Sequence, residues 1–349
     1  MNDYVKLPDF SGVSDEGLNF INETSENFDF EAFVNKLVSG ENIFNTENII
    51  DTVLRIFSNE LFSAIRILTV IIGIIIISTI LENLYNSFEK TGGYNSSFTA
   101  LALVMGLSVE IFSTTAGYAQ TVANDIVIIM NALLPVLMSL TAGCGYISVS
   151  LAANPVVLYM CNIFAVIFDK LLIPCSIIYL AVSMLDMLSE TVRLSKFREL
   201  LKKYYNFVLG IIMTIFTGML SIGSFAGASL DSLGARGARF ALSNMVPFVG
   251  RSLSEAMSAV ASASMVLKNA VGITGIVVML LLCTIPILKI AAVILCIRIA
   301  TVVSESVANR KTVEVLSSVG DSLSMIQAAV ISITVMMIIS VGIIVGMCG

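Results

Sequence analysis

IRILTVIIGIIIISTI, residues 65–80, decides what kind of protein this sequence encodes. It lies within an apolar run from Leu61 to Leu81 in which Arg66 is the only charged residue. As a helix rising ~1.5 Å per residue, this run would match the ~30 Å hydrocarbon core of a bilayer. We therefore predict that it crosses a membrane as one helix.

The composition of the whole chain extends this prediction. Hydrophobic residues make up 57% of the sequence, charged residues 13%, and the mean hydropathy is +0.94. Soluble domains are usually ~45–50% apolar and ~25% charged. We predict an all-α, polytopic membrane protein with about six to eight membrane helices. The expected spans are residues 61–81, 98–119, 126–148, 155–185, 205–227, 271–299 and 325–347.

Residues 155–185 form the least regular of these spans, because Asp169, Lys170 and Pro174 stand near the middle. The apolar halves on either side would each be only ~20 Å long as helices, too short to cross a bilayer. We therefore expect a broken or re-entrant pair of helices that enters and leaves on the same side. The alternative, a single crossing, would place both charges at mid-membrane.

Residues 1–60 form an acidic N-terminal segment ahead of the membrane domain at 61–349. They contain twelve acidic residues against three basic ones, and apolar residues at helical spacing predict two short amphipathic helices. This charge argues against binding to nucleic acid or to an anionic lipid surface. With a re-entrant pair at 155–185 the segment lies outside the cytoplasm, whereas a single crossing there would place it inside.

Orientation follows from basic residues beside the spans, which favour the cytoplasmic side. Arg310 and Lys311 mark the connection at residues 304–322, and the connection at residues 186–204 is the most basic of the short ones. Both are expected in the cytoplasm. The basic residues of the second connection are Arg193, Lys196, Arg198, Lys202 and Lys203.

Small residues recur where helices would pack closely. The segment 231–270 places apolar residues at every third or fourth position with Ser and Ala between them, which predicts an amphipathic helix that lies on the membrane or lines a cavity. The pairs Gly223 with Gly227 and Gly342 with Gly346 have the spacing of close helix contacts. These contacts form either within one chain or between copies in a homo-oligomer.

Charged residues inside the predicted spans are costly, at least ~2.5–3.5 kcal/mol at a helix centre, so they usually face a bundle interior or water. Glu110 is the hardest to place elsewhere, and we predict that it lines a polar path together with Asp169 and Lys170. Three further charges either join such a path or extend to the membrane surface. They are Arg66, Lys289 and Arg298.

Signatures of catalysis are missing from the sequence. It has no histidine, no GxSxG, no Walker A lysine and no HExxH. Its six cysteines lie in apolar runs without CxxC spacing, which predicts small core residues and not metal ligands. We expect no enzymatic activity, no metal and no other cofactor.

Two segments have a specific order of residues, GARFALSNMVPFVG at 237–250 and LKNAVGITG at 267–275. Their order, together with the pattern of spans over roughly 61–349, resembles the stage III sporulation protein AE family of endospore-forming bacteria. The positions that carry the resemblance are Phe240, Asn244, Pro247, Gly250, Lys268 and Asn269.

That resemblance implies a function that no single residue displays. Members of the family belong to a channel complex between mother cell and forespore, partly similar to specialised secretion systems, and are needed for late forespore gene expression and forespore maintenance. The protein would sit in the mother-cell membrane around the forespore, beside other membrane and ring-forming subunits, with the basic residues of 193–203 facing an ATPase. A secondary transporter of a small solute or ion and a non-conducting membrane scaffold stay open as alternatives.

Overall fold

The computed structural model describes residues 46–88, 93–188, 194–219 and 250–346, and every element in these ranges is helical. The predicted all-α fold is confirmed. The elements are α3 (Thr46–Phe88), α4 (Gly93–Gly143), α5 (Ile147–Ile167), the π-helix η1 (Phe168–Leu172), α6 (Ile173–Leu188), a helix at residues 195–219, α8 (Gly250–Glu305) and α9 (Arg310–Gly346).

Within the described ranges, five stretches of helix are long and apolar enough to cross a bilayer. They are Phe57–Ile77, Leu101–Gly143, Val157–Leu188, Cys283–Glu305 and Arg310–Gly346. The chain is therefore a multi-pass membrane protein, as predicted. The region predicted as a span at 205–227 is helical as far as residue 219, and of the small-residue segment 231–270 the structure describes residues 250–270, as the start of α8.

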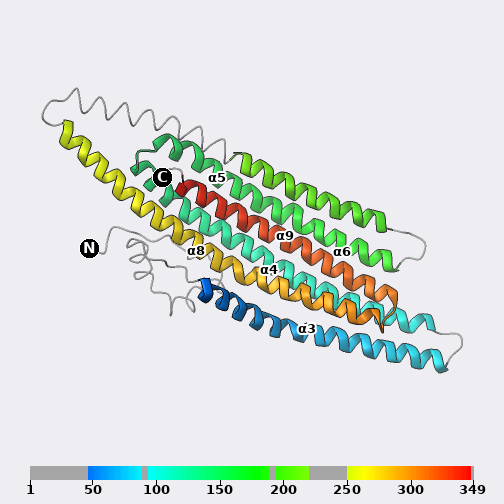
Figure 1. The fold of residues 1–349 in the computed structure, drawn as a ribbon. Helices are drawn as coiled ribbons and strands as arrows, with labels where there is room; N and C mark the ends of the chain where they lie inside the picture. Colours follow the sequence, from blue (N-terminus) through cyan, green and yellow to red (C-terminus); the bar gives the residue numbers. More distant parts are fainter. Residues whose placement is uncertain (1–45, 89–92, 189–193, 220–249, 347–349) are drawn as a thin grey trace.

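The helices lie side by side in an elongated bundle in which successive helices run antiparallel (Figure 1). Helix α9 packs against α4, α6 and α8 and forms the centre of the bundle. Adjacent residues along it are buried, including Ala329 with Val330 and Met336 with Met337. A helix that is apolar on more than one face needs protein on each of those faces, which is why the C-terminal apolar run became the core helix.

The predicted separate spans at 98–119 and 126–148 are wrong, because α4 is one continuous helix of 51 residues. The polar residues at 120–125 include no helix breaker, and Val122, Ala123 and Asp125 of this stretch are buried. Pro135 does not end the helix either. Its neighbours Leu133, Leu134 and Leu137 are buried, so tertiary packing outweighs the one backbone hydrogen bond that a proline removes.

The predicted re-entrant pair at 155–185 is also wrong, because α5, η1 and α6 form one uninterrupted helical run. Its dihedral angles stay right-handed through the junctions at Ile167 and Ile173, and the Ile173 N–H bonds to the Phe168 carbonyl in the wider π spacing. A regular α-turn would press the ring of Pro174 against a carbonyl four residues back. The π-turn directly before the proline widens the helix there and lets it continue.

These two corrections cancel each other in the topology. The chain crosses once less in α4 and once more in the α5–η1–α6 run than predicted, so the helix ends lie on the same sides relative to one another as predicted. The C-terminal ends of α3, α6 and α8 lie at one end of the bundle, with the N-terminal ends of α4 and α9 (Figure 1). The N-terminal ends of α3 and α8 lie at the opposite end, with the C-terminus of α9. Three continuous helical runs therefore separate the acidic N-terminal segment from the basic residues at the start of the 195–219 helix.

Glycines on α8 allow it to approach its neighbours closely. A Cβ atom at Gly272 would overlap with Cγ2 of Val345 on α9, and one at Gly275 would meet Leu133 of α4. At Gly342 and Gly346, by contrast, an added Cβ would meet nothing within 4 Å. That pair therefore makes no close contact within the described residues, and the contact between copies stays a prediction for it. Gly223 and Gly227 lie outside the described residues.

Gly272→Ala should destabilise the protein by about 1–3 kcal/mol, because the β-branched side chain of Val345 cannot turn aside without leaving its preferred rotamer. Thermal unfolding in detergent can be followed with a thiol-reactive dye, since Cys161 and Cys283 are buried and free in the folded state. Gly106→Ala is the matched control, because nothing lies within 4 Å of an added Cβ there. Equal melting temperatures for the two variants would contradict the close approach of α8 and α9.

Candidate functional site

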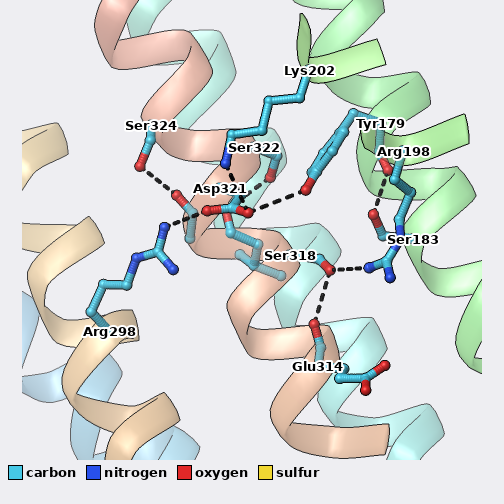
Figure 2. Close-up of polar contacts among 12 residues, drawn as sticks. Tyr179, Ser183, Arg198, Lys202, Arg298, Glu314, Ser318, Asp321, Ser322 and Ser324 are labelled. Carbon is cyan, nitrogen blue, oxygen red and sulfur yellow. Dashed lines mark hydrogen bonds and ion pairs between the residues drawn. The ribbon is translucent and has the colours of Figure 1, made fainter. Parts of the chain in front are cut away.

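Asp321 of α9 is the centre of a polar cluster that ties four helices together (Figure 2). Its Oδ1 pairs with Arg298 of α8, and its Oδ2 lies 3.1 Å from the Nζ of Lys202 on the 195–219 helix. The hydroxyl of Tyr179 on α6 donates a hydrogen bond to the same Oδ2 at 3.2 Å. One carboxylate therefore holds donors from three neighbouring helices by charge-assisted hydrogen bonds.

A second ion pair extends the cluster along α9. Arg198 Nη2 lies 3.1 Å from Asp186 Oδ2, and Arg198 Nη1 donates to the Ser318 hydroxyl at 3.1 Å. Asp186 also accepts the backbone N–H of Leu194, at the entry to the next helix. The side chains of Arg198 and Asp186 are only 19% and 10% exposed, so water screens this pair far less than an ordinary surface pair.

Gly320 makes room for the Arg298 guanidinium beside Asp321. A Cβ atom at position 320 would lie 3.1 Å from Arg298 Nε and 3.2 Å from its Cζ, so any side chain would press the guanidinium away. The hydroxyls of Ser322 and Ser324 bond to carbonyls of their own helix. This stretch of α9 thus satisfies its own hydroxyls locally and reserves the Asp321 carboxylate for the other helices.

Tyr179, Arg298 and Asp321 lie within candidate membrane spans, toward the end of the bundle where α8 meets α9, whereas Lys202 lies on the 195–219 helix outside those spans. Arg298 stands about two turns before the end of α8, and Asp321 about three turns after the start of α9. Charges at this depth are tolerated when they are paired with one another. The arrangement can fix the relative positions of four helices.

Asp321 was not predicted as a site residue, because the predicted span began at residue 325 and left Asp321 in a connection. A signal was present, since Glu314, Ser318 and Asp321 follow one another at intervals of four and three on the same face of a helix. Arg298 was predicted to join a polar path or to extend to the surface. The structure pairs it with Asp321 instead.

Three of the charges selected from the sequence line a single cavity, Arg66 of α3, Glu110 of α4 and Lys289 of α8. The cavity has a volume of about 650 Å³. Lys289 Nζ lies 4.1 Å from the centre of the Tyr118 ring, a cation–π contact. Helices α3, α4 and α8 pack against one another pairwise, so this charged cavity lies where three helices meet.

Asp169 and Lys170 are not among the residues that line the cavity with Glu110. They pair with each other on η1 at 3.1 Å, with side chains 43% and 78% exposed. Gln120 of α4 also donates to Asp169 Oδ1 at 2.7 Å. The three residues predicted to line one path are therefore divided between the charged cavity and the outer surface of η1.

The basic residues predicted to form a loop are mostly helical. Helix starts at residue 195, so Lys196, Arg198, Lys202 and Lys203 lie on its first turns, while Arg193 lies outside the described residues. Arg198 and Lys202 belong to the Asp321 cluster, whereas Lys196 and Lys203 are exposed. Lys203 pairs with Glu199. The hydrogen bond from Lys203, followed by its positive charge, lowers the pKa of the Glu199 carboxyl.

The residues that carried the family resemblance are only partly described. Phe240, Asn244 and Pro247 lie outside the described residues, and Gly250 is the first residue of α8. The other two of these residues, Lys268 and Asn269 on α8, differ in their exposure. Asn269 is exposed, but Lys268 is fully buried and its Nζ has no hydrogen-bond partner in the described part of the chain.

The helical bundle of the described residues, with five stretches long and apolar enough to cross a bilayer, defines an α-helical multi-pass membrane protein. Comparison with known proteins then gives its family. The family model described as Stage III sporulation protein AE matches residues 28–348, so the chain belongs to that family. It is 22% identical over 311 residues to the Stage III sporulation protein AE of Bacillus subtilis (strain 168), covering 89% of this chain and 78% of that protein. No solved structure matches it.

Asp321→Ala should lower the free energy of unfolding by about 2–3 kcal/mol, because it leaves Arg298 and Lys202 facing each other with no carboxylate between them. The dye-based melting assay measures the loss. Glu314→Ala is the matched control on the same helix, since it breaks only the exposed pair with Arg310 and should cost at most about 0.5 kcal/mol. Similar losses from both substitutions would show that the Asp321 cluster does not hold the helices together.

Proposed function

We propose that this protein is a membrane subunit of the channel complex that joins the mother cell to the forespore, in the mother-cell membrane around the forespore. In this function it is needed for late forespore gene expression and for maintenance of the forespore. The observation that carries the proposal is the family match over residues 28–348, which includes all five of the membrane-crossing stretches. The proposal assigns no covalent chemistry to the chain.

The lengths of the helices support a function that extends beyond a single bilayer. Helix α8 has 56 residues, and ~1.5 Å per residue makes it ~84 Å long, about twice a bilayer with its headgroups. Its candidate span, Cys283–Glu305, occupies the C-terminal part. The preceding part of α8 is therefore long enough to project well past the membrane on the side of its N-terminus, as a protein reaching into an intermembrane space would need to do.

Basic residues give the bundle an orientation. Lys196 and the pair Arg310 and Lys311 lie at the same end of the bundle, near the ends of α6 and α8, and basic connections favour the cytoplasm. On that basis the N-terminal ends of α3 and α8 face the space between the two membranes. The acidic segment 1–45, which precedes α3, then lies in that space as well.

The contacts of the basic residues show which of them are available to meet a cytoplasmic ATPase, as we propose. Arg198 and Lys202 are committed to Asp186 and Asp321 inside the bundle, so Lys196 and Lys203 are the basic side chains left on the outside of that helix. Ring-forming subunits would be met at the opposite end. A homo-oligomer is a further proposal, which the open surface at Gly342 and Gly346 allows.

A secondary transporter is the second candidate, and the charged cavity between α3, α4 and α8 is the observation in its favour. Many secondary transporters move about broken half-helices, so the predicted break at 155–185 would also have supported a transporter. That break is absent from the structure, because the region is one continuous helix with a single π-turn. The channel-complex proposal loses the same broken region as a support, but it keeps the family match over residues 28–348, so we prefer it.

Single cysteines introduced into a cysteine-free background will test the orientation. Lys196→Cys and Asn309→Cys, both at exposed positions, should react with an impermeant maleimide in inverted vesicles only. Glu255→Cys, at an exposed position near the start of α8, should react in right-side-out vesicles only. Labelling of all three positions from the same side would contradict the proposed orientation.

Cross-linking in sporulating cells will test membership of the complex. A functional tagged copy should be recovered in a large assembly with the other membrane and ring-forming subunits, and its fluorescence should outline the engulfed forespore. A tagged vegetative membrane protein of similar size, produced at the same level, is the control for random collisions in the membrane. Recovery of the chain only as a free monomer would refute the proposal.

A further inference from the structure

The charged cavity between α3, α4 and α8 differs from the Asp321 cluster in one respect. In the Asp321 cluster the charges compensate one another at hydrogen-bond distance. In the described part of the chain, the side chains of Arg66 and Glu110 have neither an ion pair nor a hydrogen bond, and Lys289 has only its contact with the Tyr118 ring. The three charges line the same space without neutralising one another.

The depth of these charges makes that arrangement costly. Arg66 lies near the middle of the candidate span Phe57–Ile77, and Lys289 lies within Cys283–Glu305. A charge at the centre of a membrane helix costs at least ~2.5–3.5 kcal/mol on insertion scales, and such residues commonly mark substrate or ion pathways. Arg66 and Glu110 are exposed and Lys289 is half-buried, so a polar solute in the cavity could reach all three side chains.

The dimensions and walls of the cavity suit a small molecule. Its volume of about 650 Å³ falls within the ~300–1,000 Å³ range of ligand sites. Aliphatic side chains such as Ile67 and Val293 form much of its wall, and Thr114 adds a hydroxyl. Apolar walls with a few convergent polar groups are the usual composition of a site for a solute.

We propose that this cavity binds a small zwitterion of net negative charge, of which the acidic amino acids are the simplest examples. Arg66 and Lys289 provide two positive charges for two carboxylates, and Glu110 provides one negative charge for an ammonium group. A ligand with two carboxylates and one ammonium neutralises the three side chains completely. The inference does not depend on the proposed function, because binding can be measured on the isolated protein.

Isothermal titration of the full chain in nanodiscs tests the proposal, with L-glutamate, glutarate and L-lysine as probes. L-glutamate should bind saturably in the millimolar range or more tightly, and L-lysine should not. Arg66→Gln and Lys289→Gln should each weaken L-glutamate binding about 10-fold or more, as expected for the loss of a charge-assisted hydrogen bond. Glu110→Gln should remove the preference for L-glutamate over glutarate, which lacks the ammonium group.

Lys170→Gln is the matched control, because Lys170 is exposed on η1 and does not line the cavity. It should leave L-glutamate binding unchanged, and the melting assay will show that each variant is folded. Absence of saturable L-glutamate binding to the native protein would overturn the proposal, as would binding that survives both cation substitutions. Cross-links from Thr114→Cys to a helix of another subunit in the native complex would also overturn it, because that helix would then be the occupant.

Discussion

The bilayer requires every backbone N–H and C=O within it to be paired inside the protein, and the rest of this structure depends on that constraint. It explains why α4 runs on through Pro135 and why the chain passes Asp169 and Pro174 by a π-turn and not by an open break. In water either site could end a helix at little cost. In lipid the unpaired backbone groups would cost several kcal/mol each, so the chain keeps its helical bonds and changes only their spacing.

The same medium sorts the charged side chains into two kinds of environment. Around Asp321 the carboxylate and its cations neutralise one another, which suits a structural function in joining helices. Around Glu110 the charges share a cavity without pairing with any residue that the structure describes, which suits the proposed binding of a small molecule there. Lys268 belongs to neither group, because it is fully buried and its Nζ has no hydrogen-bond partner among the described residues, on a helix whose neighbouring glycines allow close packing.

Hydropathy alone predicted the helical class and the membrane-crossing stretches of α3, α8 and α9, because the cost of exposing apolar residues to water is a local property of the sequence. It failed where the outcome depended on packing. Polar residues at 120–125 looked like a connection until tertiary contacts with buried Val122 and Ala123 kept them helical. The Asp321 cluster could not be predicted as a group, since Tyr179 and Asp321 are 142 positions apart and only the fold brings them together.

The π-turn at Phe168–Leu172 also determines the direction in which each later side chain on that helix points. A π-turn inserts one extra residue, and each residue of an α-helix turns the chain by about 100°. Without the insertion, α6 would be rotated by about that angle, and Tyr179 and Asp186 would point away from Asp321 and Arg198. The irregular turn at Asp169 thus sets the direction in which Tyr179, some 15 Å further along the helix, and Asp186 point toward their partners on the neighbouring helices.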